Sequence, residues 1–501
     1  MSESDYMITF CTALAAKASL DPGLPVPNPT SSYWQSEPHE LADHQSSHLP
    51  SSVDVVIIGS GMTGISVAYH LLQQEPNLRV TILEARSLTS GATGRNGGHC
   101  KEDPYDDYED LKELYGKEGA KRVVKFRLAQ LDALVKLVEE LGEDAKKVSC
   151  LRRVDGLDAF YDEDAWERVK KKVKDYLEDF PEEKDVWLVH EGSDIDERFG
   201  TINAVDCITG PAGAMWPYKL VGAVITHISN KKHYPNLSIE THTPVESISS
   251  TESDAKHPFL LTTPRGDIKA TNIIHCTNAF AAHLLPGLKG KIYPMRGQMT
   301  RQSAPPGFPR LGDQRSWILH YDFGYDYVTQ SPPHSTSSST DDIYLGGGFL
   351  KALVMGQVSV EDADVGSTRD DLQNPVALAT LQDAVEKRLR HGNGTKIVDQ
   401  WTGVMGFTID NNPVVGKVPY EISQRKPADS QTEGREWIAA GFCGNGMVNC
   451  WLSGKGTAEM LLNGEEAVRE WFPVDEYACS IERLQKMTLV DRFLEFVKDA
   501  V

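Results

Sequence analysis

The 501-residue sequence has little positive charge and no long apolar run. Its 72 acidic residues outnumber its 51 basic residues and give a formal net charge of −21. Because such a surplus repels nucleic-acid phosphates and anionic lipids, we expect neither nucleic acid nor a membrane surface as the principal partner. No uninterrupted apolar stretch approaches the ~18 residues of a membrane span, which predicts a soluble protein.

Cysteine is sparse, since the sequence holds eight and none of them forms a CxxC pair. This excludes a disulfide framework and argues against structural zinc, so we expect no metal site. The N-terminal residues 2–5 (SESD) lack the basic character of a secretory or transit signal. The last residues, 499–501 (DAV), do not match a peroxisomal Ser-Lys-Leu signal. We therefore expect a cytoplasmic protein with reduced thiols.

Two stretches carry no regular hydrophobic period. In residues 1–52, prolines recur between residues 22 and 29 and precede a Ser- and His-rich stretch. This composition predicts an irregular N-terminal arm, which Tyr33 and Trp34 could attach to the body of the protein. The second stretch, residues 331–342 (SPPHSTSSSTDD), predicts a mobile surface loop.

From residue 53 onward the pattern becomes regular. Residues 53–58 predict a buried strand, followed by a glycine turn, a helix to about residue 74 and a second strand over residues 79–83. Helices are expected over residues 110–141 and 164–180, and short strands are interleaved with them. The interleaving predicts an α/β or α+β protein with more than one lobe.

The glycine turn after the first predicted strand has the pattern G-x-G-x-x-G. Gly59 permits the tight turn, Gly61 lets the backbone approach a pyrophosphate, and Gly64 lets the helix pack on the strand. The amides at the start of the helix then face the diphosphate. Glu84 ends the second strand, where a carboxylate can accept hydrogen bonds from a ribose and disfavours a 2′-phosphate. We infer a dinucleotide site, the alternative being a turn that serves packing alone.

A second glycine-rich segment follows at residues 90–99 (SGATGRNGGH). Four glycines and one arginine suit a backbone that runs along a ligand, with Arg95 close to its anionic groups. A simple NAD dehydrogenase has no need of such a segment. Here the sequence resembles the D-amino-acid oxidase/glycine oxidase superfamily of FAD-dependent amine oxidoreductases, and the segment looks most like that of the γ-glutamylputrescine oxidase branch.

Later motifs follow the same family in order. The matching segments are Val245, residues 276–279 (CTNA), residues 294–298 (PMRGQ), residues 401–413 and residues 441–447 (GFCGNGM). Together with the glycine turn, the resemblance places the following residues at the cofactor: Gly59, Gly61, Met62, Thr63, Gly64, Glu84, Ala85, Arg86, Ser90, Gly91, Thr93, Arg95, Asn96, Gly97, Gly98, His99, Val245, Thr277, Gly406, Asp410, Gly441, Cys443, Gly444, Asn445, Gly446 and Met447.

The resemblance implies FAD as the cofactor and a two-lobe α/β fold of the glutathione-reductase type. In this fold a Rossmann-like FAD-binding domain is combined with a discontinuous α+β substrate domain. On this basis we assign residues 53–100, 201–290 and 401–501 to the FAD-binding domain and residues 101–200 and 291–400 to the substrate-binding domain, with residues 1–52 as the arm.

Some members of this family attach FAD covalently through a histidine or a cysteine. The place of the histidine is taken here by Arg95, and that of the cysteine by Val404 or Met405. We therefore predict non-covalent FAD, with His99, Cys100 and Cys443 as attachment points in another register.

Members that oxidise α-amino acids hold the substrate carboxylate with an arginine, and Met405 occupies the matching position. A buried carboxylate without a cation costs several kcal/mol, and the nearby candidates Arg296 and Arg315 are expected to be structural. The resemblance thus favours a small-molecule amine or N-substituted amino compound. A D-amino-acid or glycine-type oxidase is the alternative.

The chemistry implied is hydride transfer from the carbon that bears the nitrogen to flavin N5, which gives an imine that water hydrolyses. The amine must be neutral, and desolvation in an apolar pocket can lower its pKa enough. We expect Trp401, Met405 and Tyr344 to be catalytic and to form the pocket wall with Phe407 and Tyr321.

Tyr344 stands where oxygen-using relatives have a lysine, so the acceptor is oxygen or another compound, the latter making the protein an FAD dehydrogenase. The functions that compete with an amine oxidoreductase are an NAD dehydrogenase, which leaves the second glycine segment unexplained, and a non-catalytic flavin-binding scaffold.

Overall fold

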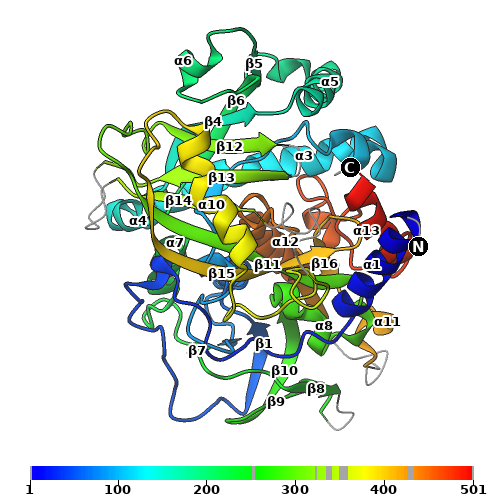
Figure 1. Cartoon of the computed structure of the whole chain (residues 1–501). Coiled ribbons are helices and arrows are strands. Elements are labelled where there is room, and N and C mark those ends of the chain that lie inside the picture. Colours follow the sequence, from blue (N-terminus) through cyan, green and yellow to red (C-terminus); the bar gives the residue numbers. More distant parts are fainter. Residues whose placement is uncertain are drawn as a thin grey trace.

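The structure is a computed structural model that describes residues 3–250, 254–321, 324–333, 341–348, 359–425 and 434–498. These residues form two β-sheets with helices packed on them, in a mixed α/β arrangement (Figure 1). Most of the predicted mobile loop, residues 334–340, lies outside the described residues.

The first sheet, sheet A, is built around the predicted strand–turn–helix–strand unit. Strand β1 (Ser52–Ile58) pairs in parallel with β2 (Val80–Leu83) and with β10 (Gly266–His275). Its almost continuous apolar run fits a strand that is covered on both faces. The strand order is β16-β17-β10-β1-β2-β7, and β9 and β8 extend from β10. The remaining bounds are β7 (Leu237–Glu240), β8 (Ser247–Ser250), β9 (Phe259–Thr263), β16 (Val414–Lys417) and β17 (Glu436–Ala440).

Two helices cover the centre of sheet A. Helix α2 (Met62–Gln74) follows the glycine turn and packs against α12 (Cys450–Asn463). The crossing is close because Gly454 has no side chain: a Cβ there would lie 2.5 Å from Cβ of Ser66. The predicted strand–turn–helix–strand unit is therefore confirmed.

The second sheet, sheet B, has the order β15-β11-β14-β13-β12-β4-β6-β3, with β5 beside β6. Its longest strands, β11 (Ile292–Ser303) and β15 (Lys396–Thr408), pair in antiparallel register with Met299 opposite Trp401. The remaining bounds are β3 (His99–Cys100), β4 (Arg152–Phe160), β5 (Leu188–His190), β6 (Asp206–Ala214), β12 (Arg315–Tyr321), β13 (Gly324–Gln330) and β14 (Ile343–Gly347).

The predicted lobe boundaries differ from the strand pairing. Strand β6 and most of β15 fall in ranges assigned to the FAD-binding domain, yet both strands pair in sheet B. The chain therefore crosses between the two sheets at other residues than the predicted ones. The division into two lobes by residue range stays our proposal.

The N-terminal arm is not wholly irregular, which corrects the prediction for residues 1–52. Helix α1 (Glu3–Ala18) precedes the prolines and lies beside α13 (Leu489–Lys498), so the first and last described helices are neighbours (Figure 1). Its residues Leu14 and Ala18 are buried in the same core cluster as Phe493. The apolar face of α1 was missed because the proline-rich stretch dominates the composition of the arm.

The other helices lie around the two sheets, and the predicted helices are both present. Their bounds are α3 (Tyr108–Leu141), α4 (Glu143–Ser149), α5 (Glu163–Asp179), α6 (Ile195–Phe199), α7 (Pro217–Ile228), α8 (Ala281–Leu284), α10 (Pro375–Arg388) and α11 (Tyr420–Ser423). No helix of the described residues is long and apolar enough to cross a membrane.

Replacing Trp401 tests the packing between the arm and sheet B. Trp401 is 0% exposed and its ring meets that of Trp34 edge-on at 6.5 Å. We expect Trp401→Ala to lower the free energy of unfolding by about 3–5 kcal/mol, since it leaves a cavity in a packed core. Urea titration followed by circular dichroism measures the change.

Val398→Ala is the matched control, since Val398 is on the same strand and 49% exposed. It should change stability by about 0.5 kcal/mol or less. Equal effects of the two substitutions would contradict the packing described here.

Candidate active site

A cavity of about 610 Å³ lies between the two sheets. One side of it is formed by the carboxyl ends of the parallel strands of sheet A, at Ile58, Leu83 and Cys276. The other side comes from sheet B, where Ile318 and Met405 face the same space. In open parallel sheets the carboxyl ends of the strands are the usual place for a ligand.

The glycine turn has a shape that only glycine allows. Gly59 has φ of +106°, and a Cβ there would lie 2.6 Å from the carbonyl oxygen of Cys276. At Gly64 a Cβ would lie 2.0 Å from the carbonyl oxygen of Gly59. The two glycine-rich segments meet at Thr93, whose Oγ1 accepts a 3.0 Å hydrogen bond from the amide of Met62. Both segments therefore line one side of the cavity.

Glu84 is fixed at the edge of the same cavity. Its Oε2 accepts hydrogen bonds from the amide and the hydroxyl of Ser60, at 3.0 and 2.7 Å, and its Oε1 accepts one from the amide of Arg86. Val245 lies at the same cavity. A carboxylate held in this way is positioned for the ribose contact expected from the sequence.

Most of the predicted cofactor residues line the cavity. They are Gly59, Gly61, Met62, Thr63, Glu84, Ala85, Arg86, Gly91, Thr93, Arg95, Asn96, Gly97, His99, Val245, Thr277, Cys443, Gly444, Asn445, Gly446 and Met447. The others, Gly64, Ser90, Gly98, Gly406, Asp410 and Gly441, lie behind its surface. Asp410 is held there by Arg483 at 2.6 Å.

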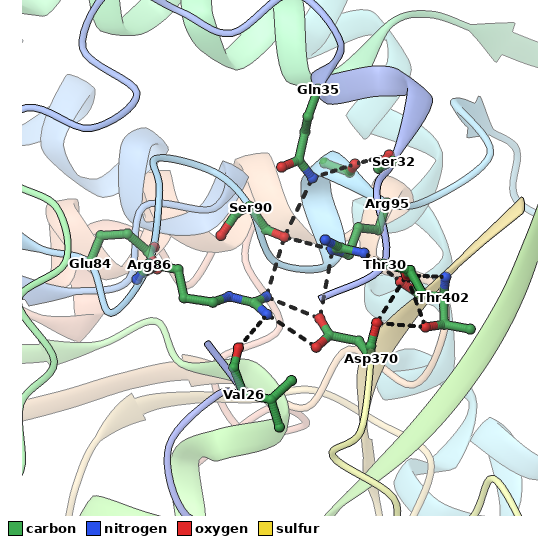
Figure 2. A network of polar contacts seen from close by, with 11 residues as sticks. Val26, Thr30, Ser32, Gln35, Glu84, Arg86, Ser90, Arg95, Asp370 and Thr402 are labelled. Atoms are coloured by element: carbon green, nitrogen blue, oxygen red, sulfur yellow. Dashed lines mark hydrogen bonds and ion pairs between the residues drawn. The ribbon is translucent and has the colours of Figure 1, made fainter. Parts of the chain in front are cut away.

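Arg95 lines the cavity, and its guanidinium is engaged within the protein. Its Nε donates to the carbonyl of Ser90 and its Nη1 to the carbonyl of Thr402, both at 2.8 Å. Figure 2 shows Arg86 and Arg95 converging on Asp370, with Arg86 donating two hydrogen bonds of 3.1 and 3.0 Å to its carboxylate. Arg95 lies 3.6 Å from the same carboxylate, and burial lowers its pKa to about 10. The buried cation is neutralised within the protein.

The N-terminal arm covers the second glycine segment (Figure 2). Ser32 Oγ and Gln35 Nε2 donate to the carbonyl of Gly94 at 2.7 and 2.9 Å, and the indole of Trp34 donates to that of Asn96. The predicted attachment of the arm through its aromatic pair is thus confirmed. Leu24 of the arm itself lines the cavity. The arm is therefore part of the wall and not an appendage.

The predicted pocket wall divides in two. Met405 and Phe407 line the cavity, whereas Trp401, Tyr321 and Tyr344 do not. Tyr344 stacks in the aromatic cluster of the arm, 4.2 Å from Trp34 between ring centroids. The structure thus separates two of the three expected catalytic residues, Trp401 and Tyr344, from the cavity. Trp401 on β15 and Tyr344 on β14 belong to one buried aromatic cluster with Trp34 of the arm and Trp216.

Several cavity residues were not predicted. Ile318 and His320 of β12 lie beside Tyr327 and Tyr325 of β13, and all four line the cavity. The available signal was a histidine in the otherwise apolar run Trp317–His320. Lys101, Glu102, Arg127 and Arg492 also line the cavity. They come from segments outside the family motifs.

Both candidate carboxylate clamps are structural, as expected. Arg296 pairs with Asp364 at 2.6 Å, and Arg315 lies over the ring of Phe199 at 5.5 Å. Neither lines the cavity.

The groups that could attach a flavin covalently are buried or engaged within the protein. Burial raises the thiol pKa of Cys443 to about 11 and that of Cys100 to about 12, so both stay protonated. His99 shares a 2.9 Å hydrogen bond with Ser316, and burial lowers its pKa to about 3.

Comparison with known proteins identifies the family. Residues 54–460 match the family described as FAD dependent oxidoreductase, DAO. The chain belongs to this family. Gamma-glutamylputrescine oxidoreductase of Escherichia coli (strain K12) is 22% identical over 448 residues, which make up 87% of this chain and 90% of that protein.

Solved structures show the same fold. Glycine oxidase from Geobacillus kaustophilus has a TM-score of 0.63 at 16% identity, covering 86% of this chain and 99% of that one. L-Amino acid deaminase from Proteus myxofaciens has a TM-score of 0.61 at 17% identity, covering 93% and 99%. The expected fold class is thereby confirmed.

FAD, the cofactor of the DAO family, fits this cavity. Gly59 and Gly61 have no side chain that would keep a diphosphate away from the backbone of the turn. Helix α2 begins at this turn, so the partial positive charge of its N-terminus faces the same place. Thr277 Oγ1 is buried at the cavity without a hydrogen-bond partner among the described residues, so it is free to bind the cofactor. Glu84 at the same cavity would accept a hydrogen bond from the ribose.

We expect FAD to be released when the protein is precipitated with acid. Burial keeps the thiols near the cavity protonated, and His99 is held by its hydrogen bond to Ser316, so we expect no covalent bond. The yellow colour should remain in the supernatant. Colour that stays in the washed pellet would show a covalent bond.

Replacing Asp370 tests the network of Figure 2. Asp370→Asn leaves two buried guanidinium groups without their carboxylate, and we expect a loss of about 3–5 kcal/mol in the free energy of unfolding, measured by urea titration. The neighbour Asp371 pairs with Arg369 at the surface, so Asp371→Asn should leave stability nearly unchanged. A small effect of both substitutions would mean that Asp370 does not fasten the arm.

Proposed function

We propose that this protein oxidises the C–N bond of an amine or N-substituted amino compound to an imine, which water hydrolyses to a carbonyl product. When bound, FAD supplies the acceptor for the hydride from the carbon next to nitrogen. The chain has to bind the amine, exclude water from it and let it lose its proton.

The observation that carries this proposal is the lack of a free cation at the cavity. Each lysine and arginine that lines it among the described residues already has an anionic partner. The pairs are Arg86 and Arg95 with Asp370, Lys101 with Asp158, Arg127 with Asp107, and Arg492 with Glu495. A substrate carboxylate would have to displace one of these partners.

The apolar lining suits an amine. Met299, Ile318, Tyr327, Met405 and Phe407 line the cavity from sheet B. An alkyl ammonium has a pKa near 10, which is roughly 3 units above pH 7, so almost all of the free amine is protonated at that pH. Desolvation among these side chains lowers that pKa and supports the neutral form.

The relatives named above support the same class of reaction, since their names place an amine or an amino acid at the flavin. The alternative is a glycine-type or D-amino-acid oxidase. It is favoured by Arg492, whose pairing with Glu495 is the longest of the five at 3.8 Å. A substrate carboxylate would compete with Glu495 for this guanidinium.

Anaerobic bleaching of the flavin tests the proposal. We expect putrescine, γ-glutamylputrescine or another alkylamine of a panel to bleach the visible band, and glycine, sarcosine and D-alanine to react at least about tenfold more slowly. A quaternary ammonium compound is the negative control, because it cannot become a neutral amine. Faster bleaching by the α-amino acids would support the alternative, and bleaching by no compound would contradict both. Mixing the reduced enzyme with air then shows whether oxygen is the acceptor.

A further inference from the structure

A largely buried polar cluster adjoins the sheet B side of the cavity. Asp158 is on β4 and pairs in register with Ile318, two residues before His320. Its Oδ2 accepts hydrogen bonds from Lys101 Nζ at 2.8 Å and from the hydroxyl of Tyr105 at 2.7 Å. The carboxylate is 0% exposed. One oxygen of Asp158 is therefore fully engaged inside the protein.

The other oxygen of Asp158 faces a histidine. Its Oδ1 lies 3.7 Å from Nε2 of His320, and both atoms are buried without a hydrogen-bond partner among the described residues. The separation is longer than a hydrogen bond, so a bond between the two atoms requires the ring to turn toward Asp158 within the plane of its stack. Two unpaired buried atoms of complementary chemistry thus point at each other.

His320 also reaches the cavity. Its ring stacks on Phe160 with centroids 4.5 Å apart and planes 8° apart, which fixes its orientation. The side chain is 24% exposed and lines the cavity although Nε2 is enclosed. With Nε2 enclosed, Nδ1 is the ring nitrogen left to meet a group in the cavity. A neutral ring that donates from Nε2 to Asp158 presents a lone pair on Nδ1 to the cavity.

We propose that His320 takes the proton of the substrate ammonium, with Asp158 as the residue that positions it. This rests on the proposed amine oxidation. The N–H bond of the ammonium breaks, its electron pair stays on the amine nitrogen, and the proton forms a bond to Nδ1. Nε2 stays protonated throughout and donates a hydrogen bond to the carboxylate of Asp158.

The charges around His320 favour this transfer. Asp158 and Asp103 both pair with Lys101, so two carboxylates and one ammonium leave one negative charge, which a proton on His320 cancels. Burial alone would raise the pKa of Asp158, but Lys101 and His320 hold it below its ordinary value. Asp158 therefore stays ionised and cannot take the proton itself. Tyr325 packs beside the ring at 5.9 Å, and its hydroxyl is neutral at pH 7.

Glu102 at the cavity would also affect a pH profile. Burial raises the pKa of Glu102 to about 7, next to Arg127. The experiment must separate Glu102 from His320.

The test is the rate of anaerobic flavin bleaching as a function of pH in wild type, His320→Gln and Glu102→Gln, with the fastest amine of the panel. At pH 7 we expect His320→Gln to be about 100- to 10,000-fold slower, the usual contribution of a general base. The deficit should shrink about tenfold per pH unit as pH approaches the substrate pKa near 10, since the amine then loses its proton in solution. A purely structural role would give a deficit that does not depend on pH.

His190→Gln is the matched control. His190 is also on sheet B and also packs on a phenylalanine, Phe199 at 4.9 Å, but it lies away from the cavity. It should bleach at the wild-type rate. A deficit of His320→Gln that is absent or constant with pH overturns the inference, as does a pH dependence that is lost in Glu102→Gln instead. If wild type itself is bleached by no amine, the proposed function fails first.

A second measurement does not depend on turnover. Nitrogen-15 NMR of histidine-labelled holoenzyme, with His320→Gln used for assignment, should show His320 in the neutral form protonated at Nε2. In Asp158→Asn this preference should be lost. A proton on Nδ1 in wild type would overturn the inference even if an amine is oxidised.

Discussion

The carboxylate of Asp370 joins parts of the chain that are far apart in sequence. It neutralises Arg86, which follows the second strand of sheet A, and Arg95, which lies in the second glycine segment. The carbonyl of the same residue accepts hydrogen bonds from the arm at Thr30 and from β15 at Thr402. Charges that are buried in this way need good partners, so the segments keep one arrangement. The side of the cavity next to the glycine segments depends on it.

The two sheets contribute different chemistry to the cavity. Sheet A brings turns with bare backbone and a helix N-terminus, which suit the phosphates of FAD. Sheet B brings apolar side chains and the enclosed pair of Asp158 and His320. Nearly all charge at the cavity is balanced within the protein. In such a low-dielectric space, whether the substrate amine is protonated has a large effect on its electrostatic energy.

The local parts of this account could be predicted from the sequence. The turn from Gly59 to Gly64 and the strands beside it depend on neighbouring residues and steric rules, and they are confirmed. What could not be predicted depends on contacts between distant segments. The glycine-rich segment suggested that Arg95 lies close to anionic groups of a ligand. Its partner Asp370 is 275 positions later in the sequence, and motif spacing does not reveal a contact over that distance. The family resemblance placed Trp401 and Tyr344 at the cavity. Both residues pack in the aromatic cluster between the arm and sheet B, and no sequence pattern predicts that packing. The pair of Asp158 and His320 arises only when β4 and β12 lie side by side.

The central claim is that the cavity between the sheets holds FAD. The most direct measurement is the visible spectrum and the flavin content of the purified, dialysed protein. The account predicts the absorption bands of oxidised flavin at one FAD per chain, and their return when protein stripped of flavin is mixed with FAD. A folded protein that shows no visible absorbance and takes up no FAD would contradict it.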